Sequence, residues 1–180
     1  MLTILQVPNP ILRQVSQPLA KIDKQVLGFI RQLADTLVHA RDPKGVGLSA
    51  IQVGKPWRIF CTYLPRPKPV IKIFINPQIT AKSKVLTLGP DQNQPILEGC
   101  LSIPLIYGPV WRHQWIKLRW QMANGKWTMD KFSDFEARVI QHELDHLNGI
   151  LFPDRSLRDH LPLYEDRSDQ LTPINLDTPR

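Results

Sequence analysis

The 180-residue chain has few cysteines, no long apolar run and no block of basic residues. Its two cysteines, Cys61 and Cys100, are too few for a disulfide framework, which favours a reducing compartment such as the cytosol. No segment approaches the roughly 20 apolar residues that span a membrane. The start, MLTILQVPNP, lacks the basic and apolar regions of a secretory signal. We therefore expect a cytoplasmic protein without a membrane partner.

The positive charge of the chain is spread rather than gathered in a nucleic-acid-binding arm. The formal net charge is +7, yet residues 154–180 hold four Arg and six acidic residues, so the excess lies in residues 1–153. Such a distribution is typical of a basic, solvated surface and argues against specific DNA recognition. The length and the 42% hydrophobic content predict one globular domain.

Apolar spacing predicts an N-terminal helix followed by strands. Residues 24–40 place six apolar side chains on one side at helical spacing: Val26, Leu27, Ile30, Leu33, Leu37 and Val38. Pro43 cannot continue this helix. Strand patterns follow in residues 57–64, 70–77 and 115–129. Within the last of these, Asn124-Gly125 predicts a β-hairpin.

A second helix is predicted at residues 133–148. Ser133 is a favourable N-cap, Glu136 completes a capping box, and Asn148-Gly149 ends the helix. Side chains three and four residues apart predict one stripe that faces the interior: Phe135, Val139, His142 and His146. We therefore predict an α+β fold, with antiparallel β-sheets packed around this central helix and an N-terminal helix beside them.

The segment QHELDHLNG, residues 141–149, contains the H-E-x-x-H arrangement of metal-dependent hydrolases. His142 and His146 are one helical turn apart, so both imidazoles can bind one ion. Glu143 is rotated by about 100° from His142 and can exchange a proton with a water or a leaving amine without binding the ion. A core helix with two hydrogen-bonded histidines is the structural alternative, which the buried stripe and the intervening Glu143 disfavour.

The motif leaves the third metal ligand open. An extended pattern with a third histidine fails, because Phe152 stands at its position. Glu165 would serve in a zinc endopeptidase, but its Pro-rich surroundings make a poor rigid scaffold. His113 and His160 are available, with no local feature that favours them. Cys61 lies in a predicted strand and is expected to be a small buried residue.

Cys100 is the favoured third ligand. It lies in LEGCLSIP, where Gly99 permits close backbone approach and Pro104 fixes the exit of the chain. A thiolate binds zinc or ferrous iron strongly. One Cys and two His leave a coordination position open for water, which is the arrangement of a catalytic site.

Three motifs together resemble the peptide deformylase family. GVGLSAIQ at residues 45–52, EGCLS at 98–102 and QHELDH at 141–146 match the family patterns GxGLAAxQ, EGCLS and HExxH, in order. The similarity covers roughly residues 5–155 and includes INP at 75–77. The resemblance implies hydrolysis of the N-formyl group from N-formyl-methionyl nascent peptides, with release of formate. It also implies a catalytic domain at 1–153, while the Pro-rich composition of residues 154–180 predicts a partly ordered tail.

The resemblance implies the roles of individual residues as well. The family metal is natively Fe²⁺, which Zn²⁺, Ni²⁺ or Co²⁺ can replace, and its ligands here would be Cys100, His142 and His146. Glu143 would be the general acid and base. Gln52 and the backbone N–H of Leu101 would stabilise the oxyanion. The residues expected to contact the substrate are Gly45, Val46, Gly47, Gly99, Arg138 and Val139.

Several residues depart from the family pattern. Ser49 replaces an alanine, and its buried hydroxyl needs a hydrogen-bond partner. Lys44 stands where many relatives carry an acid. Arg138 stands near the methionine pocket, where it is expected to border the pocket mouth.

The partners and the location leave alternatives open. The acidic tail differs from the basic C-terminal helix by which some family members dock on the ribosome. The sequence therefore leaves open whether the ribosome surface is a partner. A mature organellar protein would look the same, which leaves the stroma or matrix as alternative locations. A non-catalytic, ribosome-associated binding protein is a further alternative, and the intact Glu143 and Gln52 argue against it.

Overall fold

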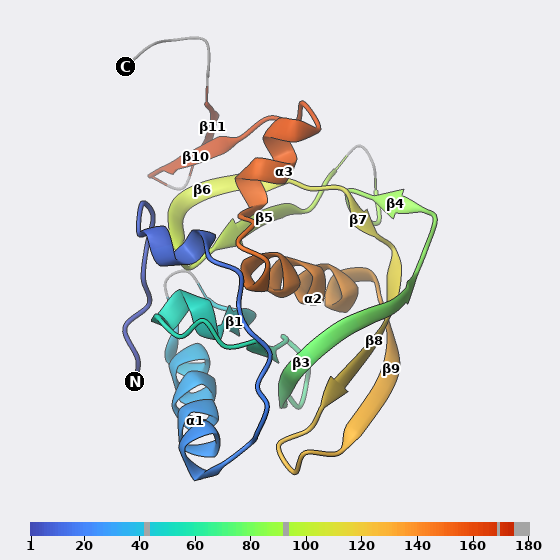
Figure 1. Ribbon diagram of the computed structural model, residues 1–180. Coiled ribbons are helices and arrows are strands. Elements are labelled where there is room, and N and C mark those ends of the chain that lie inside the picture. Colours follow the sequence, from blue (N-terminus) through green and yellow to red (C-terminus); the bar gives the residue numbers. More distant parts are fainter. Residues whose placement is uncertain (42–43, 92–93, 169, 175–180) are drawn as a thin grey trace.

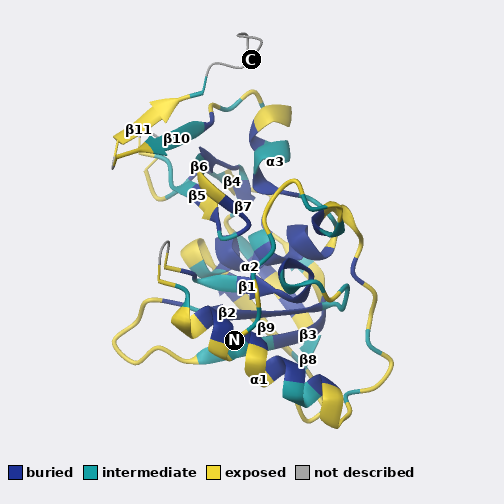
Figure 2. Cartoon of the chain, turned by 90° about the vertical axis from the view of Figure 1, so that its left-hand side faces the viewer, coloured by how far each residue is buried: buried dark blue, intermediate teal, exposed yellow. Residues whose placement is uncertain are grey.

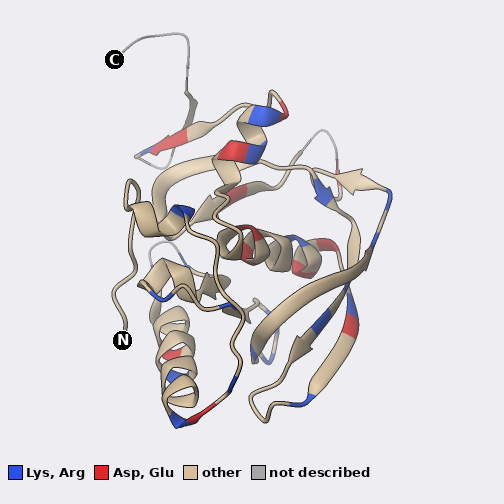
Figure 3. Ribbon diagram, viewed as in Figure 1, with Lys and Arg blue, Asp and Glu red and all other residues tan. Residues whose placement is uncertain are grey.

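The computed structural model describes residues 1–41, 44–91, 94–168 and 170–174. Within them, three α-helices and antiparallel sheets confirm the predicted α+β class (Figure 1). The α-helices are α1 (Lys24–His39), α2 (Asp134–Leu147) and α3 (Phe152–Arg158), and two 3₁₀ turns are η1 (Pro10–Arg13) and η2 (Ala50–Val53). No helix in these described ranges is long and apolar enough to span a membrane. Lys and Arg lie on helices, strands and loops alike (Figure 3).

The larger sheet has five strands in the order β1-β2-β3-β8-β9. Their bounds are Gly47–Ser49 for β1, Ile59–Tyr63 for β2, Ile71–Lys82 for β3, Trp115–Gln121 for β8 and Trp127–Ser133 for β9. The β8–β9 pair turns at Asn124-Gly125, as the sequence predicts. β1 is an edge strand of this sheet.

A second sheet has four strands in the order β11-β10-β6-β5. They are β5 (Leu97–Cys100), β6 (Ile103–Pro109), β10 (Tyr164–Arg167) and β11 (Gln170–Pro173), while β4 (Leu86–Thr87) and β7 (Arg112–His113) form a separate pair. The segment predicted as a tail therefore contributes strands, because Tyr164 and Glu165 pair with β6. Residues 169 and 175–180 of that prediction lie outside the described residues.

Helix α1 covers one face of the five-stranded sheet near β1 and β2. Asp23 caps its N-terminus by accepting a hydrogen bond from the Val26 N–H. Four predicted core positions are buried, namely Val26, Ile30, Leu33 and Leu37. Val38 is 37% exposed, which corrects its assignment to the buried side. Val38 is rotated by about 100° from Leu37 around the helix axis, so its side chain lies outside the apolar stripe.

Helix α2 packs one side against strands β2, β3, β8 and β9 of the five-stranded sheet. The helix contributes Ala137, Ile140, Leu144 and Leu147, and the strands contribute Phe60, Phe74, Ile116, Leu118 and Phe132. The rings of Phe60 and Phe74 stack at a centroid distance of 4.6 Å. Most of the helix is buried (Figure 2).

The start of α2 differs from the predicted capping box. Ser133 is the N-cap residue, but its side chain makes no capping hydrogen bond. Glu136 instead binds Lys72 at 2.7 Å and also pairs with Arg66. A charge-assisted contact is stronger than a neutral one, so the two cations draw the carboxylate away from the helix end. Phe135 is 40% exposed, which corrects its place in the interior stripe.

Two glycines provide a matched test of the fold. Gly149 ends α2 with φ +71°, and a Cβ there would collide with the Arg13 carbonyl oxygen. We expect Gly149→Ala to lower the free energy of unfolding by about 2 kcal/mol or more. Gly28 lies within α1 with no atom near its missing Cβ. Gly28→Ala should raise that free energy by about 0.5–1 kcal/mol. Denaturant titration measures both free energies of unfolding. A Gly149→Ala variant as stable as the wild type would contradict the collision with the Arg13 carbonyl.

Candidate metal centre and active site

Three side chains that can bind a metal converge between α2 and the end of β5. The Sγ atom of Cys100 lies 3.2 Å from Nε2 of His146, which lies 3.2 Å from Nε2 of His142. Each offers one ligand atom within 4.8 Å of the others, and all three residues are buried. No other such group of three occurs among the residues that the structure describes. A thiolate and two imidazoles suit zinc or ferrous iron, and they leave a position open for water.

The other candidates for a third ligand lie elsewhere. Glu165 is in β10 and pairs with Arg167. His113 is bonded through Nδ1 to the Ser83 carbonyl. Cys61 is fully buried in β2, which confirms the prediction that it is a small core residue.

Glu98 holds His142 in place through a hydrogen bond of 3.0 Å to Nδ1. The same carboxylate accepts two hydrogen bonds from Arg112, at 2.9 and 2.7 Å, and one from Arg138 at 2.9 Å. Burial alone would raise the pKa of Glu98, but the charge and hydrogen bonds of Arg112, with those of His142, hold this pKa well below its usual value. The ionised carboxylate directs Nε2 of His142 toward Cys100.

Sequence reasoning missed the roles of Glu98 and Arg112. Glu98 stands two residues before Cys100, in a motif already singled out, and the rule that ligand histidines need an anchoring partner could have found it. Arg112 lies in β7 and had no local signal. Beyond Glu98 it also bonds Asp145, which in turn binds Arg155 of α3.

Glu143 points from α2 toward β1. A Cβ on Gly47 would collide with Oε1 of Glu143, so the glycine makes room for the carboxylate. Its other oxygen, Oε2, is buried and has no hydrogen-bond partner in the described part of the chain. Burial raises the pKa of Glu143 to about 7. A carboxylate with this pKa and a free oxygen can both accept and release a proton near neutrality.

Gln52 is fixed in η2 by Ser49. The Ser49 hydroxyl and its backbone N–H both donate to Oε1 of Gln52 at 2.8 Å. The amide nitrogen therefore faces the site, where it donates to Ser102 Oγ at 3.1 Å and lies 3.5 Å from Sγ of Cys100. The serine that replaces alanine thus finds its hydrogen-bond partner in the predicted oxyanion donor.

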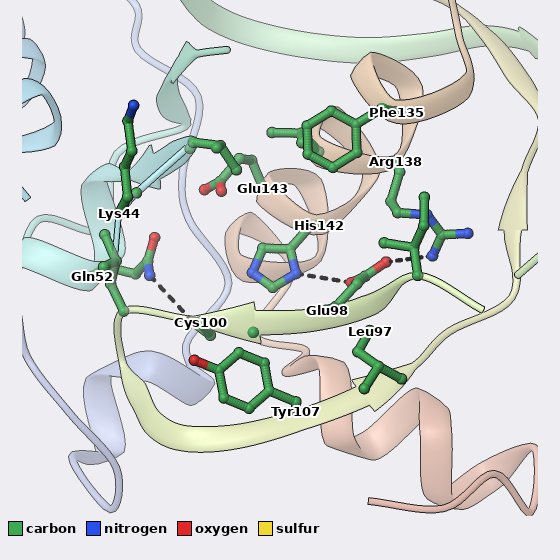
Figure 4. Close-up of a pocket in the computed structure, with 17 residues that line it drawn as sticks. Lys44, Gln52, Leu97, Glu98, Cys100, Tyr107, Phe135, Arg138, His142 and Glu143 are labelled. Carbon is green, nitrogen blue, oxygen red and sulfur yellow. Dashed lines mark hydrogen bonds and ion pairs between the residues drawn. The ribbon is translucent and has the colours of Figure 1, made fainter. Parts of the chain in front are cut away.

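A cavity of about 190 Å³ opens over these groups. Figure 4 shows Lys44 and Gln52 at one end, and Leu97 and Arg138 at the other, with His142 and Glu143 between. The predicted substrate contacts and the second predicted oxyanion donor all line it: Gly45, Val46, Gly47, Gly99, Leu101, Arg138 and Val139.

Arg138 differs from its predicted place at the pocket mouth. Its side chain is only 4% exposed, and it donates hydrogen bonds to Glu98 and to the carbonyls of Val110 and Thr87. Its guanidinium therefore lies at the inner end of the cavity, because these three partners hold it there.

Sequence and structure comparisons agree on one family. The polypeptide deformylase profile matches residues 1–160. The chain belongs to the polypeptide deformylase family. A peptide deformylase of Novosphingobium aromaticivorans is 35% identical and covers 86% of this chain and 88% of its own. The family removes the N-formyl group from nascent peptides in a metal-dependent hydrolysis, and the chain is such an enzyme.

Solved peptide deformylases share the fold. The Thermotoga maritima structure superposes with a TM-score of 0.75 at 34% identity and covers 86% of this chain and 97% of that one. A Met-Ala-Ser-bound structure from Acinetobacter baumannii gives a TM-score of 0.76 at 28% identity, covering 86% and 98%.

The third ligand can be tested by metal content. We expect Cys100→Ser to lose bound metal, because a hydroxyl is a far weaker ligand than a thiolate. Glu165→Ala is the matched control and should keep its metal, since that carboxylate lies in β10. Metal analysis of both purified variants decides whether Cys100 or Glu165 is the third ligand. Loss of metal from Glu165→Ala but not from Cys100→Ser would favour an endopeptidase-like site.

Proposed function

We propose that this chain hydrolyses N-formyl-methionyl peptides with Cys100, His142 and His146 as ligands of one Fe²⁺, and with α2 as the central catalytic helix. The proposal rests on one observation above the others, namely that the Cys-His-His group shares a cavity with Glu143 and Gln52. Zinc, nickel or cobalt fits the same donors. When bound, the metal supplies Lewis-acid activation, which lowers the pKa of a water molecule to about 7.

Glu143 is the proposed general base and acid. Its free Oε2 accepts a proton from the water that attacks the formyl carbon. As the carbon–nitrogen bond breaks, the carboxyl group delivers that proton to the leaving nitrogen. The products are formate and a peptide with a free amino terminus.

Gln52 and Leu101 are the proposed oxyanion donors. Negative charge develops on the formyl oxygen during attack, and fixed neutral donors stabilise it without moving at the moment of reaction. Ser49 fixes the Gln52 amide by two hydrogen bonds, which supports this role. The Leu101 N–H follows Cys100 directly, in the turn between β5 and β6.

The substrate is proposed to bind as an additional strand. The cavity lies between two edge strands, β1 and β5, and both offer unpaired backbone groups toward an extended peptide. Gly45, Val46 and Gly47 would pair with the peptide on one side and Gly99 on the other. The solved Acinetobacter baumannii relative carries the peptide Met-Ala-Ser, which supports a peptide occupant.

All proposed catalytic residues lie within residues 1–153, the proposed catalytic domain. Formylated nascent chains occur where translation begins with formyl-methionine, so we place the protein in the cytoplasm, with the organellar stroma or matrix as the alternative. The basic net charge of +7 is compatible with the ribosome surface as a partner.

The proposed reaction has a direct test. Protein purified without oxygen should release formate from formyl-Met-Ala-Ser, and the metal content of the same sample should identify the ion. Acetyl-Met-Ala-Ser is the control for general amide hydrolysis. A metal-loaded sample that releases no formate would overturn the proposal.

Glu143 can be tested by one amide substitution. Glu143→Gln keeps the size of the side chain but cannot accept the proton, so we expect kcat to fall by about 10²–10⁴-fold. Metal content should stay that of the wild type, because Glu143 is not among the three converging ligands. Near-normal turnover would contradict the proposed role.

A further inference from the structure

One face of the hairpin formed by β8 and β9 points away from α2. Ile116, Leu118 and Phe132 pack against that helix, and side chains alternate along a strand, so the residues between them point outward. Helix α1 packs on this outer side of the sheet near β1 and β2, at the opposite end from β9 (Figure 1). We call the outward residues of β8 and β9 the hairpin face, which consists of Trp115, Lys117, Arg119, Gln121, Trp127, Met129, Lys131 and Ser133. Six of these eight residues are exposed and none is buried.

The hairpin face gathers positive charge. Its ionisable side chains are Lys117, Arg119 and Lys131, and none of them forms an ion pair with another residue in the described part of the chain. The single acidic residue of the two strands is Asp130, which stands opposite Leu118 and so belongs to the other alternate set. Basic residues occur on both β8 and β9 (Figure 3). Strand pairing thus builds a cationic surface in a chain that has no basic arm.

The central pair of the hairpin face has two like charges. Lys117 and Lys131 are direct cross-strand partners, and like charges placed directly opposite each other destabilise a sheet. A lysine on an edge strand can serve to prevent pairing with another chain, which would explain Lys131 of β9. This explanation does not extend to Lys117, because β8 lies between β3 and β9. An anion bound between the two ammonium groups would remove the repulsion.

Two tryptophans lie beside these cations. The Arg119 guanidinium carbon lies 4.2 Å from the ring centroid of Trp127, and Nζ of Lys131 lies 4.7 Å from that of Trp115. Trp127 is still 43% exposed. The two tryptophans stand at opposite ends of the β8–β9 ladder, which places them roughly 20 Å apart. Unpaired bases stack on aromatic rings and on arginine planes, while nearby cations contact the phosphates.

We propose that the hairpin face binds single-stranded RNA without preference for base sequence. The bases stack on Trp127, on the outer plane of Arg119 and on Trp115, and a phosphate lies between Lys117 and Lys131. This interaction goes beyond the proposed hydrolysis and uses none of its residues.

Other occupants fit the hairpin face less well. A second copy of the chain would bring the same three cations against each other. An acidic peptide would neutralise the cations but offers no flat surfaces for the two rings. Insertion into a lipid layer needs rings that project freely, whereas each ring here has a cation over it. The family acts on nascent peptides, which are made where RNA is abundant, so RNA is favoured over DNA.

The charge contacts can be tested by the salt dependence of binding. Fluorescence anisotropy of a labelled eight-nucleotide RNA measures Kd for the full-length protein at several salt concentrations. Each phosphate contact to a single strand contributes about 0.7 to the slope of log K against log salt concentration. The double variant Lys117→Gln/Lys131→Gln should therefore lower this slope by about 1.4. Lys24→Gln/Arg31→Gln removes the same charge from exposed positions of α1 and should keep the wild-type slope.

The stacking contact has its own pair of variants. Trp127→Leu keeps an apolar side chain but has no ring, so we expect the RNA to bind about fivefold or more weakly. Trp127→Phe keeps a ring and should bind within about twofold of the wild type. Thermal unfolding shows whether each variant folds, and if Trp127→Leu does not fold, the lysine pair decides alone.

Four results would overturn the inference. The first is a wild-type Kd weaker than about 10⁻⁴ M, the upper end of non-specific binding to nucleic acid. The second is an α1 control that lowers the slope as much as the lysine pair does. The third is a folded Trp127→Leu variant that binds like the wild type. The fourth is tighter binding of duplex RNA, single-stranded DNA of the same sequence, polyglutamate or phosphatidylserine vesicles. Binding needs neither metal nor turnover, so failure of the proposed reaction would leave this test unaffected.

Discussion

The buried carboxylate of Glu98 is the contact on which the rest of the site depends. It accepts hydrogen bonds from Arg112, Arg138 and His142, and it is almost completely excluded from solvent. Removing one partner of a buried ion pair costs about 3–5 kcal/mol, because the remaining charge loses its compensation. The arrangement therefore fixes the imidazole of His142 and joins α2 to β5 and β7. The ion pairs and hydrogen bonds of Glu98 thus both orient His142 and stabilise the contact of α2 with β5 and β7.

The two main sheets supply different residues to the cavity. The five-stranded sheet buries the apolar side of α2, and its edge strand β1 brings Gly47 close to Glu143. The four-stranded sheet supplies Cys100 and the rest of β5, which lines the other side of the cavity. Because each sheet ends at the cavity in an edge strand, unpaired backbone groups are available at the site without any strand being broken.

Local patterns predicted a large part of this structure. The spacing of His142 and His146, the hairpin at Asn124-Gly125 and the helix that begins after Asp23 depend on residues near in sequence, so the sequence contained the necessary information. The choice of Cys100 among five candidates needed chemistry as well, because a thiolate with two imidazoles makes an open site. The structure places this sulfur beside both imidazoles.

Two of the wrong predictions share one physical origin, which is competition from distant residues. Glu136 satisfies the pattern of a capping box, but Lys72 of β3 and Arg66 reach it from another part of the chain. Arg138 looks like a residue of a pocket mouth until acceptors more than 25 residues away in sequence bind it inside. No periodicity in the sequence encodes such pairings, because they depend on which strands meet.

The pairing of β10 with β6 connects the C-terminal segment to the candidate metal centre through backbone hydrogen bonds. β6 also pairs with β5, whose last residue is Cys100, so only two ladders of backbone hydrogen bonds separate Tyr164 from the sulfur-bearing strand. Disorder introduced near residue 164 would reach the thiol as a loss of strand rigidity. The C-terminal segment thus supports the strand that carries Cys100, and a label or fused domain attached beyond it would act on β10 and β11.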